Sequence, residues 1–177
     1  MAKATNPMLE TLINCRVYNN NNDLIGVANV DLPDIQPMTS TVSGIGIAGE
    51  VEAPVLGHYQ SMSVTLHWKG LDRNLGALGA FQAHALEIRG EQQAYDAGTG
   101  EFKPVPVRIV LRGMPKSMNL GSFEAGSNTE AETEFEVVYF KMYIDGKEVC
   151  EIDKYNFIAR FGGTDYLKQV RADLGLN

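Results

Sequence analysis

The chain has 177 residues, 44% of them hydrophobic, and a formal net charge of −7. This length fits one buried core, so we predict a single domain spanning 1–177. No apolar run approaches the ~18 residues that a membrane-spanning helix needs, so stable membrane insertion is not expected. The negative charge argues against a surface that grips nucleic acid by neutralising phosphates.

The excess of acid is concentrated in one segment, 119–153. This segment contains nine acids and two bases, whereas acids and bases are equal in number elsewhere. Within it Glu130, Glu132, Glu134 and Glu136 occur at every second residue. Because side chains on a strand alternate between faces, these four would form one acidic stripe.

The start of the chain has a charge at Lys3 but no apolar stretch behind it, which is unlike a secretory signal peptide. The two cysteines, Cys15 and Cys150, do not make a disulfide framework, and disulfides are rare in cytosolic proteins. We therefore expect a protein made and folded in a cytoplasm, with two free, buried thiols.

Taken in chain order, the first elements predict a hairpin. Residues 11–18 form a short apolar-rich strand, and 24–30 form the returning strand. Between them, 19–23 contains only Asn and Asp, which favour turns because they tolerate left-handed backbone. Pro33 ends the second strand, since proline cannot donate a hydrogen bond to a central ladder.

The segment 61–68 alternates with period two, which is typical of a half-buried strand. Its apolar residues Met62, Val64, Leu66 and Trp68 are predicted to face the core. Similar alternation over 84–89, 105–112 and 135–143 predicts three more strands. The dipeptide Asp145-Gly146 then predicts a hairpin turn into a strand over 148–157.

Helical signals are few. Residues 72–78 predict one short helix. Residues 164–174 predict a second, with Thr164 as the N-terminal cap and Gly175 as the stop. The fold class that follows is a mainly antiparallel β domain, a sandwich or barrel, with one or two helices.

The segment 33–57 does not fit a compact domain. It contains three prolines and four glycines, yet also Ile45, Ile47, Val51 and Val55. A long segment with exposed apolar side chains is usually functional or interfacial. Two interpretations remain open: an arm that leaves its own subunit to pair with a neighbour, or a loop folded over its own core.

Motifs for catalysis or ligand binding are weak. The letters of 44–49 match a dinucleotide fingerprint, but no strand–helix pattern surrounds them, so glycines that let two backbones approach closely are the better account. His58, His67 and His84 lack metal-ligand spacing, no serine lies in a nucleophile elbow, and Glu50 and Glu52 have no pocket signature. We predict no catalytic, cofactor or metal site.

Several stretches together resemble the major tail tube proteins of contractile phage tails. The most specific is the run Thr41-Val42-Ser43-Gly44-Ile45-Gly46-Ile47-Ala48-Gly49-Glu50 followed by Pro54-Val55-Leu56-Gly57-His58. The segments 24–33, 61–69, 135–143, 151–156 and 165–175 are also similar to that family. The resemblance therefore covers nearly the whole chain.

The resemblance implies a fold of two packed antiparallel sheets, a sandwich or split barrel, with a short helix, a C-terminal helix and a long β-hairpin arm. It also implies that six copies form a ring in which one sheet of each joins a barrel around a channel. Stacked rings would make a rigid tube that penetrates the target envelope and, in a phage, conducts DNA.

The partners implied are further copies of the chain, the tail sheath protein, baseplate or initiator proteins and tail terminator proteins, while DNA passes without specific binding. Assembly is expected in the bacterial host cytoplasm, and the product is a virion or a released particle such as a tailocin, a phage-tail-like bacteriocin. The arm, 33–57, is the expected inter-subunit contact. The interface residues expected within it are Thr41, Val42, Ser43, Gly44, Ile45, Gly46, Ile47, Ala48, Gly49, Glu50 and Val55.

The acidic stripe is expected to face either the channel or the sheath. We expect the surface that faces the cargo to be acidic or neutral, because each lysine or arginine that neutralises a phosphate adds affinity for DNA. An alternative function is a β-sandwich binding module of the carbohydrate or adhesin type, which would need exposed aromatic residues on one face. A small β-barrel enzyme is a third, and no catalytic constellation supports it.

Overall fold

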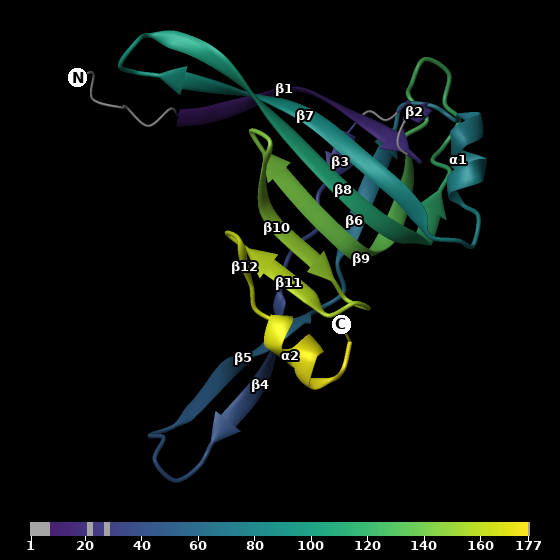
Figure 1. Cartoon of the computed structure of the whole chain (residues 1–177). Helices are drawn as coiled ribbons and strands as arrows, with labels where there is room; N and C mark the ends of the chain where they lie inside the picture. The colour runs from purple at the N-terminus through teal and green to yellow at the C-terminus, as the bar shows by residue number, and fades with distance from the viewer. Residues whose placement is uncertain (1–7, 21–22, 27–28, 177) are drawn as a thin grey trace.

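The computed structural model describes residues 8–20, 23–26 and 29–176. Most of them lie in strands of two antiparallel sheets, with two short helices (Figure 1), which confirms the predicted mainly β class. The strands are β1 (Met8–Asn19), β2 (Asp23–Ile25), β3 (Asn29–Asp31), β4 (Pro37–Ser43), β5 (Glu50–Tyr59), β6 (Ser63–Trp68), β7 (His84–Asp96), β8 (Glu101–Asn119), β9 (Ala131–Ile144), β10 (Lys147–Asp153), β11 (Ile158–Phe161) and β12 (Thr164–Asp165). The helices are α1 (Arg73–Leu78) and α2 (Lys168–Asp173).

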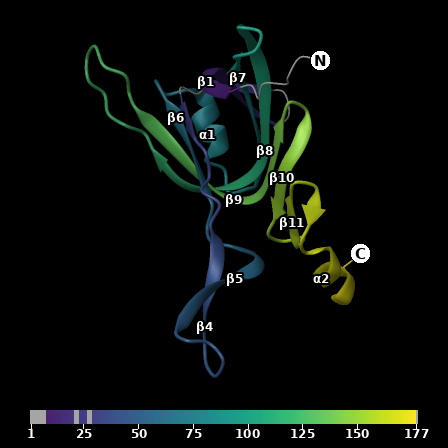
Figure 2. The same ribbon diagram turned by 90° about the vertical axis from the view of Figure 1, so that its left-hand side faces the viewer.

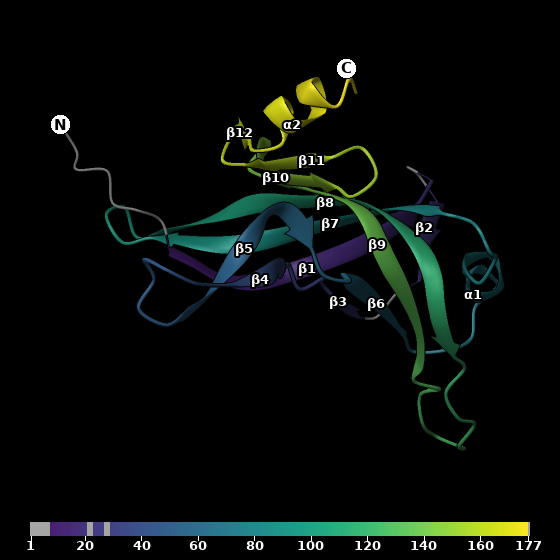
Figure 3. The ribbon, with the colours of Figure 1, turned by 90° about the horizontal axis from the view of Figure 1, so that it is seen from below.

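The larger sheet has ten strands and is strongly bent. Its path runs β12-β11-β10-β9-β8-β7-β1-β2, while β6 pairs with β9 and β3 pairs with β6. The β8–β9 ladder has register shifts between Arg112 and Gly113 and between Pro115 and Ser117. Such irregularities bend a sheet and increase its twist. As a result, β3 and β6 lie over one face of β1, β7 and β8 (Figure 3).

The core lies between these two layers. Met62, Val64, Leu66 and Trp68 are each at most 1% exposed, which confirms the alternation predicted for this segment. The opposing layer contributes apolar side chains from β1, β7 and β8 to the same cluster: Val17, Leu86, Ile88, Ile109 and Leu111. The indole N–H of Trp68 donates a hydrogen bond to Thr133 Oγ1 at 3.1 Å, so its polar atom is satisfied in the core.

The predicted turn between β9 and β10 is confirmed. Asp145 and Gly146 have φ angles of 50° and 71°. Positive φ at both central residues gives the turn whose twist matches that of the two strands it joins.

The strand predicted over 24–30 is wrong as a single element. β2 pairs with β1, as the hairpin prediction required, but β3 pairs with β6 in the other layer. The chain therefore crosses from one layer to the other after Gly26, and residues 27–28 of the predicted strand lie outside the described residues. Apolar alternation cannot reveal such a crossing, because both strands bury a face against the same core.

The predicted start of the C-terminal helix at Thr164 is also wrong. Gly162 and Gly163, with φ of 56° and 85°, turn the chain back so that Thr164 pairs with Phe161 in β12. The helix α2 begins only at Lys168, although its predicted stop at Gly175 is confirmed by a φ of 69°. In the described ranges, no helix is long and apolar enough to cross a membrane.

The helix α1 agrees with its prediction. It begins at Arg73, and the side chain of Asp72 caps it by accepting a hydrogen bond from the backbone N–H of Asn74 at 3.2 Å. Leu75 and Leu78 on this helix are buried. Asp72 is a favourable N-cap because its carboxylate satisfies a backbone donor that the helix leaves unpaired.

Both cysteines are free thiols, as predicted. Cys150 is buried in the core, and burial raises the pKa of its thiol. Cys15 is only partly buried, so the predicted burial is correct for Cys150 alone.

Candidate assembly interface

The segment predicted as an arm is a β-hairpin that projects from the body. β4 and β5 form a two-stranded sheet that has no ladder to the ten-stranded sheet. Figures 1 and 2 show the hairpin extending well beyond the other strands. An isolated two-stranded hairpin is marginally stable in water, so a hairpin of this kind gains from packing against another surface. We call residues 37–59 the arm.

The two faces of the arm differ in polarity. Val42 is opposite Val51 in the ladder, and Ser40 is opposite Ala53, so these residues share one face. Thr41 is opposite Glu52 on the other face, and Ser43 is opposite Glu50. Val42 and Val51 are 42% and 51% exposed. The arm therefore presents an apolar face and an acidic, hydroxyl-bearing face, and no other described segment of the chain covers either of them.

The tip of the arm has two isoleucines on a glycine-rich turn. Ile45 is fully exposed and Ile47 is 40% exposed. Gly44, Gly46 and Gly49 have φ between 99° and 147°, a region that other residues rarely adopt. Within the chain no atom lies within 4 Å of a Cβ built on these glycines, so the close backbone approach predicted from the sequence does not occur inside one subunit.

Every residue of the predicted interface lies on the arm. In chain order, Thr41, Val42 and Ser43 end β4, the residues from Gly44 to Gly49 form the turn, and Glu50 and Val55 belong to β5. All of them are exposed. Their contact with a neighbouring subunit remains a prediction.

The root of the arm is held against the C-terminal segment. Gly57 has φ 69°, and a Cβ there would lie 2.4 Å from the side chain of Leu167, so glycine is required for this approach. Lys154 Nζ donates to the carbonyl of Gln60, just after β5, at 2.9 Å. These contacts fix where the arm leaves the body.

A histidine bridges three neighbouring strands of the larger sheet, one of which, β3, precedes the arm. His67 on β6 lies between two carboxylates: Nε2 is 2.9 Å from Asp31 on β3, and Nδ1 is 3.3 Å from Glu132 on β9. The hydrogen bond to Asp31 raises the pKa of His67, and Glu132 acts in the same direction. The protonated ring is thus favoured where three strands meet.

This arrangement predicts a pH-dependent contribution to stability. Because the pKa of His67 is higher in the folded state, its contribution is fully present below the unfolded-state pKa of about 6.5 and is lost as the pH rises through the folded value. The free energy of unfolding of wild type minus His67→Gln should be larger at about pH 5.5 than at about pH 8.5, by up to ~1 kcal/mol for partly exposed pairs. Urea unfolding measures both values. The variant His58→Gln, which replaces an exposed histidine on the arm, is the comparison, and a wild-type excess over His67→Gln that grows with pH would contradict the assignment.

A second projection was not predicted from the sequence. The ends of β7 and β8 and the first half of β1 continue past β3 and β6 as a twisted extension, at the upper left of Figure 1. Its exposed apolar side chains are Met8, Leu9, Leu12, Ile13 and Phe102. So many exposed apolar groups on one extension indicate a contact surface.

The larger sheet has incompletely paired edges on both sides. β1 pairs with β2 only over Val17–Asn19, so its edge from Met8 to Arg16 has no partner strand among the described residues. At the other side the sheet ends in two short strands, β11 with four residues and β12 with only two, so most of that edge is also left without a partner strand in the described part of the chain. Unpaired edges are sites where strands of another chain can add.

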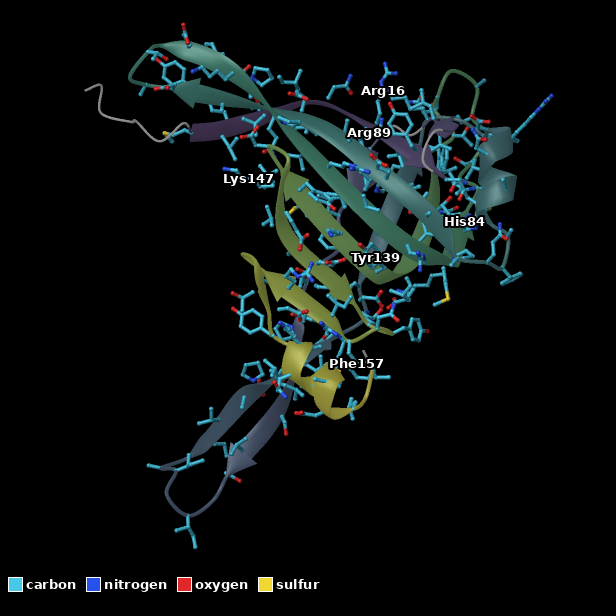
Figure 4. The ribbon with its side chains drawn as sticks, viewed as in Figure 1. Arg16, His84, Arg89, Tyr139, Lys147 and Phe157 are labelled. Atoms are coloured by element: carbon cyan, nitrogen blue, oxygen red, sulfur yellow. The ribbon has the colours of Figure 1, made fainter. Side chains whose placement is uncertain are left out.

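One face of β1 and β7–β12 points away from the core, and we call it the open face. Its charged residues form cross-strand rows: Arg16 is opposite Arg89, and Arg89 is opposite Arg108. Figure 4 shows Arg16 and Arg89 near each other over β1 and β7, and Tyr139 over β9. Aromatic rings lie under the guanidinium groups, since the Arg89 Cζ is 4.5 Å from the centre of the Tyr18 ring.

Glu87 is a buried carboxylate on this open face. The side chain is 3% exposed, and its Oε1 accepts hydrogen bonds from Arg89 Nε at 2.6 Å and Arg108 Nε at 2.7 Å. Burial raises the pKa of Glu87, but the two guanidinium groups outweigh it, and the pKa lies below its ordinary value. Glu87 is therefore ionised at neutral pH and bridges two arginines that would otherwise face each other.

Other charged residues of the open face also form ion pairs. Lys141 lies 2.9 Å from Glu148, and Arg160 lies 2.7 Å from Glu151. By the strand registers, the bases of this face are Arg16, Arg89, Arg108, Arg112, Lys141 and Arg160. The acids placed there by the same registers include Glu87, Glu91, Glu148, Glu151, Asp153 and Asp165, and the outward side of β9 adds Glu132, Glu134 and Glu136, so acids outnumber bases.

The predicted acidic stripe is partly neutralised. β9 begins at Ala131, so Glu130 precedes the strand, while Glu132, Glu134 and Glu136 alternate on it as predicted. Glu132 contacts His67, Glu134 lies 2.7 Å from Lys116, and Glu136 lies 3.2 Å from Lys154. Whether this stripe faces a channel or a sheath remains a prediction.

The structure offers little support for small-molecule chemistry. Among the described residues no group of His, Cys, Asp and Glu side chains could hold a metal ion. His84 is buried in the core with its ring edge against Phe135, and Trp68 is buried too. The sole tryptophan thus cannot form an exposed sugar-stacking platform.

Known proteins are similar to this chain over nearly its whole length. A family model described as phage tail tube protein FII matches residues 9–175. The tail tube protein of Escherichia phage P2 is 30% identical over 167 residues, which cover 90% of this chain and 94% of that protein.

Solved structures have a similar fold. A chain from the sheath/tube terminator structure of the PVC extracellular contractile injection system aligns with a TM-score of 0.51 and 17% identity, covering 74% of this chain and 94% of that one. A chain from the extended PVC sheath–tube complex aligns with a TM-score of 0.49 and 22% identity, over 73% and 87% of the two chains.

Proposed function

Because this chain belongs to the phage tail tube protein FII family and is a structural tail tube subunit rather than an enzyme, we propose that six copies close into a ring and that rings stack into the inner tube of a contractile tail. The observation that most supports this is the arm, a hairpin whose apolar face and apolar tip are left uncovered by the described residues of its own chain. In the proposed tube the arm packs on a neighbouring copy through residues 41–50 and Val55.

The sheet edges support ring closure. Each copy has an unpaired β1 edge on one side of the sheet and short strands on the other. A contact between two different surfaces of identical copies is heterologous, and it closes into a ring when the rotation between copies permits. A closed ring of sheets removes exposed strand edges, which would otherwise promote aggregation.

In this ring the open face lines the channel. The opposite face of the same strands packs on β3, β6 and the core, so it is not available to a channel. The open face has polar and charged side chains, many of them in ion pairs and with acids in excess, as suits the wall of a water-filled channel. This agrees with the expectation that the cargo-facing wall is acidic or neutral.

The tube would be surrounded by a tail sheath, started by baseplate or initiator proteins and ended by a terminator. Sheath and terminator proteins are named with the tube chains in the PVC structures. Assembly would occur in the bacterial host cytoplasm. The finished particle would then penetrate a target envelope, either as a phage tail that conducts DNA without binding it or as a headless, bacteriocin-like particle.

Negative-stain microscopy of concentrated protein, alone and with baseplate proteins from the same source, tests the proposal. Six-fold rings or hollow rods are the expected result. If neither preparation gives rings or rods, and the protein instead binds a carbohydrate saturably as a monomer, the alternative of a β-sandwich binding module is favoured.

A further inference from the structure

The position of Glu87 is energetically unusual. Removing a carboxylate from water costs several kcal/mol, and an ion pair recovers this only with good geometry. Glu87 is nevertheless 2% exposed on a face where the neighbouring charged groups are about half exposed, with side-chain exposures of 48% for Arg89 and 53% for Arg108. Both guanidinium groups reach inward to it, so the acid is covered by the two bases with which it pairs.

The arginines around Glu87 form a pattern suited to a polyanion. Arg16, Arg89 and Arg108 are consecutive cross-strand neighbours over β1, β7 and β8. Like charges directly opposite each other destabilise a sheet, so this row needs a counter-ion. Arginines in a row with aromatic rings beside them are also the side chains that bind nucleic-acid backbones and bases.

We propose that Glu87 keeps the open face from binding nucleic acid, by directing the guanidinium groups of Arg89 and Arg108 inward and cancelling one of their two positive charges. This rests on the proposed function, in which the open face is the channel wall along which duplex DNA moves. Without Glu87, both guanidinium groups would be free to turn toward the passing phosphates, and each subunit of the ring would gain one uncompensated positive charge. Glu87 would thus determine that the wall conducts DNA rather than retains it.

The variant Glu87→Gln tests this. Glutamine has the same shape and can still accept a hydrogen bond from one arginine, so circular dichroism should show a folded subunit. Binding of a short labelled DNA duplex, followed by fluorescence anisotropy at low salt, should become about tenfold tighter. The dependence of log affinity on log salt should steepen by about one, as expected for one more released counter-ion.

Two further variants test whether tighter DNA binding by Glu87→Gln comes from the loss of its ion pairs, rather than from the lost negative charge or from altered folding. Glu91→Gln removes one acid from the same face of β7, but Glu91 forms no ion pair among the described residues, so its effect should be clearly smaller. The double variant Glu87→Gln/Arg89→Gln restores the balance and should bind DNA as weakly as wild type. A merely structural role for Glu87 would not produce this reversal.

Two results would overturn the inference. One is a folded Glu87→Gln subunit whose affinity for the duplex equals that of wild type. The other is a variant subunit that binds DNA while rods built from it retain no more DNA than wild-type rods, because the open face would then not line the channel. Failure to form rods at all is a separate result, since it addresses the proposed tube and leaves the subunit measurement valid.

Discussion

Replacing Ile45 or Ile47 with aspartate is expected to abolish rod formation while leaving the subunit folded. Both side chains lie on the exposed turn of the arm, outside the buried core. A charge there costs the monomer little, because surface substitutions usually change stability by less than about 0.5 kcal/mol. In a packed interface the same charge would be buried without a partner, which costs several kcal/mol per copy. The effect repeats at every subunit.

Sedimentation followed by negative-stain microscopy measures rod formation, and circular dichroism measures folding. Ile45→Leu is the matched control, because it keeps an apolar side chain of similar volume at the tip and should still assemble. If the aspartate variants build rods of normal number and diameter, the arm tip is not a subunit contact. If they fail to fold, the tip has a structural role that its exposure does not reveal.

Replacing Trp68 with alanine is expected to destabilise the subunit by about 3–5 kcal/mol, the range for deleting a large buried aromatic side chain. Trp68 is 1% exposed and is the largest fully buried side chain of the described core. Its removal also leaves the Thr133 hydroxyl without the indole donor that lies 3.1 Å away. Since whole domains are stable by about 5–15 kcal/mol, this one change should leave the fold marginal.

Urea unfolding followed by far-ultraviolet circular dichroism measures the loss. Trp68→Phe is the comparison, because it keeps most of the apolar volume and removes mainly the hydrogen bond, at a cost of about 1–2 kcal/mol. A loss below 1 kcal/mol for Trp68→Ala would mean that β6 is not packed as described. A similar loss in both variants would place the main contribution in the bond to Thr133.

The strands nearest the core were predictable because each buries every second side chain, which leaves a period-two pattern of apolar residues in the sequence. Along 62–68 every second residue is apolar and buried, and Asp145-Gly146 has the backbone that only a few residue types accept. These signals are local, so a single sequence contains them. The arm could be recognised for the opposite reason, since its valines and isoleucines had no core to occupy.

What escaped prediction depends on contacts between distant segments. The alternation over 84–89 predicted the strand that contains Glu87 but not the burial of this acid, because the burial follows from Arg108, twenty-one residues later and brought close only by the β7–β8 ladder. The crossing between β2 and β3 leaves the apolar pattern unchanged. The late start of α2 follows from the turn at Gly162 and Gly163, which returns Thr164 to a strand. Register and crossover are properties of the tertiary structure.

The arm also bears on how long an assembly of this chain becomes. It projects from one end of the body, while the other end has the different projections formed by the β7–β8 extension and the β8–β9 connection (Figure 2). An assembly joined through such arms is polar, with donor hairpins at one end and vacant receiving surfaces at the other. Each added layer recreates the same vacancy, so heterologous stacking has no intrinsic endpoint. No feature in the described part of the subunit limits the number of layers. A defined length would therefore require another molecule that sets the length or ends the stacking.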